Sequence, residues 1–323
     1  MDFFTEERLV EANSLLRKVI SHTLQEEGKD ATKIGTAKNN LGMVYYNQGN
    51  FKAAKKILTS VYEQDLVLFG RLNFNSIIDG LNLAWAEEGL YELEASIKMY
   101  RDCWKASFAE LGEDHPTTLL ALSSMSWYGV AYEVASSHSA EETLRLTELA
   151  LGQQHPDTIT PRAAVTWRLI DCGQLHDARI LAGENFSVAQ DYFGPNHSQT
   201  GICELDVVAT LSPNDPEAYA VTIRAFEKIY QALGKNHIDT ARAVMNLGFI
   251  MSHRGQLMEA QDALRNAQIL YSRMLPPNHP DRTASALSLE LIQYAIKKSR
   301  TTEFLSRLSR KPHFRRYIPS PTL

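Results

Sequence analysis

Residues 111–118 read LGEDHPTT, and four later stretches repeat their pattern of a glycine or proline followed three places on by a histidine. These are LGQQHPDT at 151–158, FGPNHSQT at 193–200, LGKNHIDT at 233–240 and LPPNHPDR at 275–282. The histidines are spaced 40, 42, 40 and 42 residues apart: His115, His155, His197, His237 and His279. A fixed period of this length predicts an array of similar supersecondary units rather than one globular fold.

The same spacing extends upstream. Seven residues stand 40 or 42 places apart, and we use them as repeat marks: Gly28, Gly70, Gly112, Gly152, Gly194, Gly234 and Pro276. Six repeats of 40–42 residues therefore fill residues 28–275. We expect residues 276–310 to form a degenerate capping repeat and residues 311–323 to form a basic, proline-containing tail.

Each repeat has the pattern of two helices. In the sixth repeat, Val244, Leu247 and Met251 follow a helical spacing that ends at Gly255, and a second amphipathic pattern begins at Leu257. The unit is therefore helix, turn, helix. Stacked units of this kind predict an all-α fold, a right-handed α-α superhelical solenoid.

Small residues recur at the turn between the two helices. Glycine stands 21 places after the mark and alanine 26 places after it: Gly49, Gly173 and Gly255, with Ala54, Ala178 and Ala260. Glycine ends a helix at low cost because it tolerates left-handed backbone angles. The second repeat has Tyr91 at this turn position. Because Ala12 lies 42 residues before Ala54, residues 1–27 are expected to hold only the second helix of an incomplete repeat.

The recurring histidine is explained by a helix start. It precedes Pro116, Pro156 and Pro280, and proline is favoured at the first helical position because its missing N–H would have no partner there. We therefore expect each histidine at or beside a helix cap. A shared metal is disfavoured, because neighbouring helices lie roughly 8–10 Å apart while zinc needs nitrogens at about 2.0–2.1 Å.

Bulk composition narrows the class of protein. The chain has 323 residues, 44% of them hydrophobic, and a formal charge of -5, which argues against a surface that binds nucleic acid throughout. The amino terminus is acidic where a secretory signal would be basic, and no run of about 18 apolar residues occurs. A cytoplasmic protein without a membrane partner is expected. Its three cysteines, Cys103, Cys172 and Cys203, are expected to be reduced thiols buried in helices.

The repeat motif resembles that of a known family. LGxxHPDT, followed by NLGxxYxxxG and a later alanine pair or Glu-Ala, is similar to the tetratricopeptide repeats of kinesin light chain type, whose unit is about 42 residues. The closest matches are Asn40-Leu41-Gly42 with Gly49 and Asn246-Leu247-Gly248 with Gly255. HEAT and armadillo repeats have similar periods but would not be expected to carry the NLG signature.

Two companions of such arrays are missing from the sequence. It has no long heptad coil at the amino terminus, with which a kinesin light chain holds its motor, and no GxxxxGK[ST] loop. The resemblance therefore covers the array alone. It implies a superhelix whose concave surface is lined by the first helix of each pair, and this is where a ligand would lie.

Aromatic residues gather at one position of the first helix. Fifteen places after the mark stand Met43, Trp85, Trp127, Trp167, Ala209 and Phe249. Aromatic residues supply much of the energy of protein interfaces, so these side chains could form a ladder along the groove. An aromatic stripe at helical spacing can equally belong to the core, and this alternative stays open.

The resemblance also points to polar groups in the groove. Twelve places after the mark, an asparagine of peptide-binding tetratricopeptide arrays grips the ligand backbone with its amide donor and acceptor. The matching residues here are Asn40, Asn82 and Asn246, for which a helix–helix hydrogen bond is the alternative. Arg242 is a polar exception among otherwise apolar neighbours. The predicted partner-binding set is Asn40, Met43, Asn82, Trp85, Trp127, Trp167, Arg242, Asn246 and Phe249.

Three functional hypotheses follow. The first is a non-catalytic scaffold that binds an apolar segment of a protein or peptide partner in the groove, without cofactor or metal, since no GxSxG, HExxH or Rossmann motif occurs. The second is an enzyme or a carrier of a hydrophobic small molecule, with His138, His176 or His253 as acid or base. The third assigns anion binding or nuclear targeting to the basic residues 297–316, which could equally form the solvated face of a capping helix.

Overall fold

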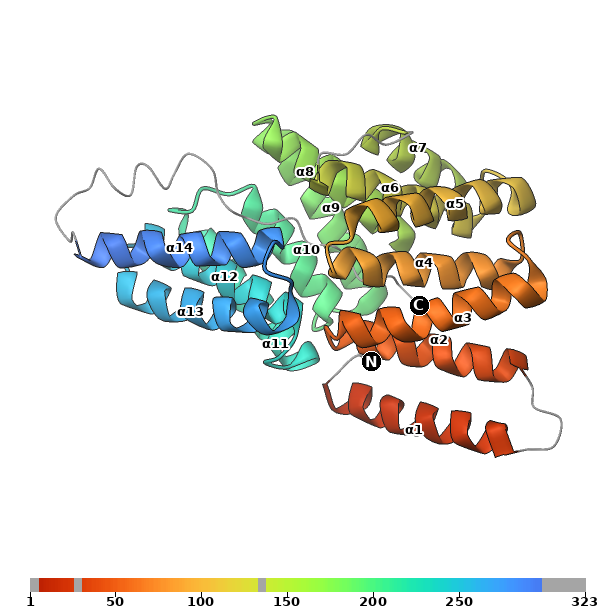
Figure 1. Ribbon diagram of the computed structural model, residues 1–323. Helices are drawn as coiled ribbons and strands as arrows, with labels where there is room; N and C mark the ends of the chain where they lie inside the picture. The colour runs from red at the N-terminus through yellow and green to blue at the C-terminus, as the bar shows by residue number, and fades with distance from the viewer. Residues whose placement is uncertain (1–5, 26–30, 133–137, 298–323) are drawn as a thin grey trace. The chain divides into compact units, whose positions relative to one another are not determined.

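The computed structural model describes residues 6–25, 31–132 and 138–297 (Figure 1). Within these residues it contains fourteen α-helices and one short 3₁₀ helix, and it contains no strand. The first seven helices are α1 (Glu6–Gln25), α2 (Ala31–Asn47), α3 (Phe51–Phe69), α4 (Phe74–Gly89), α5 (Leu93–Leu111), α6 (Pro116–Tyr132) and α7 (Ala140–Leu151). The prediction of an all-α fold is confirmed.

The second half of the chain continues the alternation of helices. It contains η1 (Pro156–Thr158), α8 (Ile159–Asp171), α9 (Leu175–Phe193), α10 (Ser198–Ala209), α11 (Pro216–Leu233), α12 (Ile238–His253), α13 (Leu257–Met274) and α14 (Pro280–Lys297). Even-numbered helices are the first helices of the repeats, and odd-numbered helices are the second helices. The expected tail, residues 311–323, and the end of the expected capping repeat lie outside the described residues.

Helices that follow one another in the sequence pack as pairs within two compact units. The division falls inside α8: residues up to Ala164 belong to an amino-terminal unit, and residues from Val165 belong to a carboxy-terminal unit. In the amino-terminal unit each helix from α1 to α7 packs on the next, and in the carboxy-terminal unit the same holds from α9 to α14. First helices of neighbouring repeats also contact each other, as α2 does α4 and α12 does α14. The hand of the superhelix stays a prediction.

The recurring histidines cap helices as expected. Each accepts at Nδ1 a hydrogen bond from the backbone N–H two residues on: Thr117 to His115 at 3.2 Å, Asp157 to His155 at 3.2 Å, Gln199 to His197 at 3.0 Å, Asp239 to His237 at 3.1 Å and Asp281 to His279 at 3.1 Å. In the second repeat Oδ1 of Asn73 accepts the equivalent hydrogen bond from the backbone N–H of Asn75 at 2.9 Å. The cap satisfies a backbone donor that the helix itself cannot.

The turn position after each first helix requires left-handed backbone angles. Gly49, Gly173 and Gly255 have φ of 71°, 77° and 78°. Tyr91, the residue that replaces glycine in the second repeat, adopts φ 59° and is the sole non-glycine residue with positive φ in the part of the chain that is described. The turn geometry is therefore kept even where the sequence lacks glycine, at a local conformational cost.

The glycine of the NLG motif lets two helices approach closely. A Cβ atom built on Gly42 in α2 would lie 2.6 Å from the side chain of Leu58 in α3. The equivalent Cβ on Gly248 in α12 would lie 2.9 Å from the side chain of Leu264 in α13. Both contacts join the two helices of one repeat, so the motif reflects packing.

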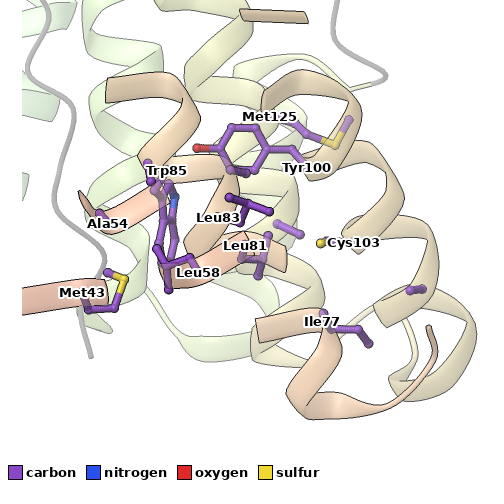
Figure 2. Packing of buried hydrophobic residues seen from close by; sticks show 14 residues of the cluster. Met43, Ala54, Leu58, Ile77, Leu81, Leu83, Trp85, Tyr100, Cys103 and Met125 are labelled. Atoms are coloured by element: carbon purple, nitrogen blue, oxygen red, sulfur yellow. The ribbon is translucent and has the colours of Figure 1, made fainter. Parts of the chain in front are cut away.

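The core of the amino-terminal unit is continuous across repeats. Figure 2 shows a cluster that contains Met43 from α2, Leu58 from α3, Trp85 from α4, Tyr100 from α5 and Met125 from α6. Leu58 and Tyr100 are completely buried. Each helix pair thus completes the core of its neighbours, as expected for a repeat array in which a single unit cannot bury its apolar faces alone.

Two of the three cysteines follow the prediction. Cys103 and Cys203 are buried, whereas Cys172 is exposed near the end of its repeat's first helix, so the prediction of burial is wrong for Cys172. Burial raises the pKa of the Cys103 thiol to about 12, with a smaller contribution from the charge of Asp102. That thiol therefore stays protonated. No described helix is both long enough and apolar enough to cross a membrane.

Candidate partner-binding surface

The residues predicted for the aromatic ladder are mostly buried. Met43 and Trp85 belong to the same hydrophobic cluster of the amino-terminal unit (Figure 2), and Trp127 on α6 is 2% exposed. In the carboxy-terminal unit Trp167 on α8 is buried, while Phe249 on α12 is only partly buried. The tryptophans are thus placed as core residues would be, and Phe249 is the ladder residue with surface to offer.

Trp167 is fixed by a buried hydrogen bond. Its indole N–H donates to Oδ1 of Asp206 on α10 over 3.0 Å. Burial raises the pKa of Asp206 to about 7, and the indole N–H acts in the opposite direction because it stabilises the carboxylate. We call the number of places between a residue and its repeat mark its offset. The hydrogen bond therefore joins the residue at offset 15 of one repeat to the residue at offset 12 of the next repeat.

Trp127 has the same position but lacks this partner. The residue at offset 12 of the following repeat is Ala164, whose side chain offers no acceptor. In the described residues the indole N–H of Trp127 has no hydrogen-bond partner. Trp167 is therefore hydrogen-bonded to the following repeat and Trp127 is not, although both tryptophans stand at the same position of their repeats.

The three asparagines at offset 12 have different surroundings. Asn82 is buried and donates through Nδ2 to Oδ1 of Asn39 on α2 at 3.0 Å, which is the helix–helix hydrogen bond considered as an alternative. Asn246 is buried on α12, and Asn40 is exposed on α2. Of the three amides, that of Asn40 belongs to the one exposed residue.

Arg242 takes part in a network of charges along α12 and α14. Its guanidinium donates from Nη1 to Asp239 at 3.0 Å, and from Nη2 and Nε to Oδ2 of Asp281 at 3.2 Å each. Its side chain is 10% exposed. Arg242 therefore connects the sixth repeat to the helix that follows it.

The end of α12 combines an aromatic ring with unpaired polar atoms. The rings of Phe249 and His253 lie 4.6 Å apart between centroids. Nε2 of His253 and Oε1 of Gln256 are buried and have no hydrogen-bond partner within the described chain. Burial lowers the pKa of His253, so the neutral imidazole is favoured. Gln256 was missed in the sequence, where it appears only as the polar residue before α13.

The three histidines considered as acid or base lie at different elements. His138 precedes α7 and lies against the ring of Trp104 at 5.6 Å between centroids, whereas His176 begins α9. His253 lies on α12. Among the described residues no group of three or more His, Cys, Asp or Glu side chains is placed to hold a metal ion.

A buried pair of carboxyl groups also escaped the sequence patterns. Asp79 on α4 has its pKa raised to about 7 by burial, by the charge of Asp65 on α3 and by the hydrogen bond between the two carboxyl groups. The pKa of Asp65 is raised by burial, and the same hydrogen bond opposes this rise. The signal was present: alanine or cysteine stands at the position of Asp79 in most other repeats, as Ala37, Ala121, Cys203 and Ala243.

Comparison with known proteins agrees with the helix-pair architecture. Residues 35–61, which cover most of α2 and the first half of α3, match the family model described as a tetratricopeptide repeat. No curated protein matches the sequence.

Several solved structures are similar at low identity. One is BtubC (BKLC) from P. vanneervenii, at 13% identity and TM-score 0.35, over 82% of this chain and 92% of that chain. Two others are forms of a Podosopora anserina protein described as a kinesin light chain with nearly identical TPR-like repeats. Both are 15% identical, with TM-scores of 0.26 and 0.27, and cover 84% and 85% of this chain and 92% of theirs.

The helix pairs themselves carry the comparison with the repeat family. Consecutive helices pack in pairs, each well-kept pair turns at a left-handed glycine, and one pair matches the family model. Residues 35–61 therefore form a tetratricopeptide repeat, and the other described helix pairs have the same helix–turn–helix form.

Proposed function

We propose that this chain is a non-catalytic scaffold that binds an apolar segment of a partner protein along the first helices of its repeats. Tetratricopeptide repeats are in general modules for protein–protein interaction. Support comes from the contacts of α2 with α4, α10 with α12, and α12 with α14, which bring equivalent positions of successive first helices near each other. A partner segment can then meet the same kind of position repeatedly within a unit.

The nine predicted residues take two roles in this proposal. Asn40 and Phe249 have side chains that reach the surface, and Arg242 reaches it in part, so these three are proposed to contact the partner. The remaining six are buried and are proposed to support that surface from behind: Met43, Asn82, Trp85, Trp127, Trp167 and Asn246.

The observation that carries the proposal is the end of α12. Phe249 offers an apolar ring, and the ring of His253 lies beside it. Nε2 of His253 and Oε1 of Gln256, three residues further along the chain, have no partner in the described structure. A buried polar group without a hydrogen bond costs about 1–3 kcal/mol. The main chain of a bound segment supplies both C=O and N–H, so a small movement of these side chains on binding would recover that cost.

The test is affinity capture with matched variants. Asn40→Ala and Phe249→Ala change first-helix residues, whereas Asn266→Ala and Tyr230→Ala change an exposed asparagine and an exposed aromatic residue on second helices. A partner protein that is retained by the wild type and the two control variants but lost from Phe249→Ala would support the proposal.

Two results would contradict the scaffold. One is equal loss from the first-helix and second-helix variants, with circular dichroism showing all four folded. The other is a hydrophobic small molecule that copurifies with the wild type and is lost from Phe249→Ala, because that result would favour a carrier.

A further inference from the structure

The second helix of a repeat packs against two first helices, and the register of its residues decides which of them each side chain meets. A Cβ atom built on Gly80 of α4 would lie 2.6 Å from Cys103 of α5, in the same repeat, and 3.2 Å from Tyr62 of α3, in the preceding repeat. Cys103 stands at offset 33 and Tyr62 at offset 34. Offset 33 therefore faces the first helix of its own repeat, and offset 34 faces the first helix of the next repeat.

In α1 the residue at offset 33 is exposed. This helix has the register of a second helix, and within the described residues α2 is the helix that packs extensively on it (Figure 1). Val19 stands at offset 33 of α1 and is 48% exposed. The equivalent residues of the six later repeats are at most 3% exposed: Val61, Cys103, Thr143, Asn185, Ala225 and Ala267.

Two more residues extend this exposed face along α1. Leu15 and Ala12 precede Val19 by four and seven residues, so the three side chains share one face of the helix. Leu15 is exposed and Ala12 is partly exposed. Three alanines equivalent to Ala12 are completely buried: Ala54, Ala178 and Ala260. We call Ala12, Leu15 and Val19 the α1 face. It is the apolar surface that a first helix covers in the later repeats.

The later repeats also show which side chains meet across such a face. A small residue of one helix faces a large residue of the other, as Gly42 faces Leu58 and Gly248 faces Leu264. The α1 face carries a small and a large residue three places apart, Ala12 and Leu15. Two copies of α1 that run antiparallel about a two-fold axis can therefore set each Ala12 against the Leu15 of the other copy. Such a contact is isologous, so it covers both exposed faces at once and closes.

The charges of α1 are complementary in the same orientation. The amino-terminal half of the helix is acidic overall, with Glu6, Glu7, Arg8 and Glu11. The carboxy-terminal half is basic, with Arg17 and Lys18 and no acidic residue. When Ala12 lies against Leu15 of the second copy, Glu11 lies beside Lys18 of that copy. Opposite charges then meet on both sides of the axis, whereas a parallel pair would bring like charges together.

The surroundings of Lys18 keep this half of the helix basic. Arg17 is directed to α2, where it donates to the hydroxyl of Tyr45, and Lys18 is exposed. The start of α2 follows the end of α1 and adds Lys33 and Lys38 as the charged residues of that helix (Figure 1). Four charged residues follow α1 beyond the stretch that overlaps in this register, and they lie outside the described residues: Glu26, Glu27, Lys29 and Asp30.

We propose that two copies of this chain associate through α1, antiparallel about a two-fold axis, with Ala12 of each copy against Leu15 of the other. Burial of the α1 face stabilises the pair, and the contact of Glu11 with Lys18 sets its orientation. The contact uses none of the nine residues assigned to partner binding, so it is independent of the scaffold function. Its consequence is a dimer with two partner-binding surfaces, which can hold a partner of two equivalent segments more tightly than one copy does.

Sedimentation equilibrium of the full chain tests the association. A reversible monomer–dimer equilibrium is expected at concentrations up to about 0.1 mM, because an interface of one helix per copy is small. Val19→Asp should weaken the association by roughly a hundredfold, since the two-fold axis introduces the change twice. Val10→Asp is the matched control, because Val10 is 59% exposed and lies nine residues away, on the opposite side of the same helix. This variant should associate as the wild type does, and circular dichroism should show both variants folded.

Charge changes test the orientation. Glu11→Lys alone or Lys18→Glu alone brings like charges together across the axis and should weaken the association severalfold at low salt. The two changes combined should restore it, because each residue again meets an opposite charge. A parallel pair would not show this restoration.

Three results would overturn the proposal. The first is a chain that stays monomeric throughout the concentration series, which would leave the α1 face to a different protein. The second is a dimer that Val19→Asp leaves intact, which would place the contact elsewhere. The third is a loss caused by either single charge change that the combined change does not correct.

Discussion

At the scale of single residues, the same helix-capping hydrogen bond recurs at a fixed position of the described repeats. Five histidines and Asn73 all accept a hydrogen bond from the backbone N–H two places on, so imidazole and amide serve the same purpose. Nδ1 must be unprotonated to accept that bond. Nδ1 of each histidine therefore serves as the cap acceptor, as the side-chain oxygen does in Asn73.

The cap can be tested at His155, which lies before η1 and α8. We expect His155→Ala to lower the free energy of unfolding by about 1 kcal/mol, the usual cost of losing an N-cap side chain. His155→Asn should lose much less, because Asn73 shows that an amide fits this position. Urea denaturation of the three proteins makes the measurement. Equal losses in the two variants would mean that packing of the imidazole, rather than the cap, is what matters.

Asp206 gives a prediction on pH. Its pKa is about 7 in the folded chain against an ordinary 3.8, so between these values the folded state binds more protons than the unfolded state. The free energy of unfolding should therefore fall as pH rises from about 4 to about 7, and it should not recover above that range. Asp206→Asn removes the ionisation, and its side-chain oxygen can still accept from Trp167.

The comparison of Asp206→Asn with the wild type isolates this effect, because Asp79 titrates in the same range in both proteins. We expect the variant to be more stable than the wild type at pH 8 by roughly 2–4 kcal/mol and to approach it at pH 4. Denaturation series at several pH values provide the check. A stability difference that stays constant with pH would refute the assignment.

At the scale of helices, the spacing between the two members of a pair is set by glycine. Gly42 and Gly248 occupy equivalent places and face Leu58 and Leu264 of the partner helix. Gly183 on α9 differs, since a Cβ atom there would meet nothing within 4 Å. A methyl group added at Gly42 or Gly248 would therefore press on the partner helix, whereas a methyl group added at Gly183 would meet free space.

These glycines allow a matched pair of substitutions. Gly42→Ala should destabilise the chain by roughly 1–3 kcal/mol, because the added methyl group would overlap the side chain of Leu58. Gly183→Ala should stabilise it by about 0.5–1 kcal/mol, because alanine is the better helix former and has free space there. Thermal denaturation checks both signs. Stabilisation by Gly42→Ala would show that the helices can separate at little cost.

At the scale of the whole molecule, stability is distributed among neighbouring helix pairs. Within the two compact units, the helices from α1 to α7 and from α9 to α14 pack mainly on the helices before and after them. Arrays of this kind approximate a sum of unit and nearest-neighbour terms. A local defect should therefore stay near its place in the sequence.

Leu58→Ala provides that defect in the core of Figure 2. Leu58 is completely buried, so its truncation should cost about 2–5 kcal/mol. Hydrogen exchange followed by mass spectrometry should show faster exchange in α2 to α5 and unchanged exchange in α12 and α13. Equal acceleration throughout the chain would instead indicate one cooperative unit that includes both halves.

The sequence by itself determined the repeat period, the helix pairs, the histidine caps and the left-handed turns. These depend on residues a few places apart, so each repeat displays them without its neighbours. The tertiary structure decided which of these side chains are buried and which remain exposed at the surface. Trp85, Trp127 and Trp167 share one offset with Phe249, yet they are buried while Phe249 is partly exposed. Likewise the partners of Asn82 and Asp206 lie on helices of other repeats. Burial and pairing depend on the packing of adjacent repeats, which a single repeat does not encode.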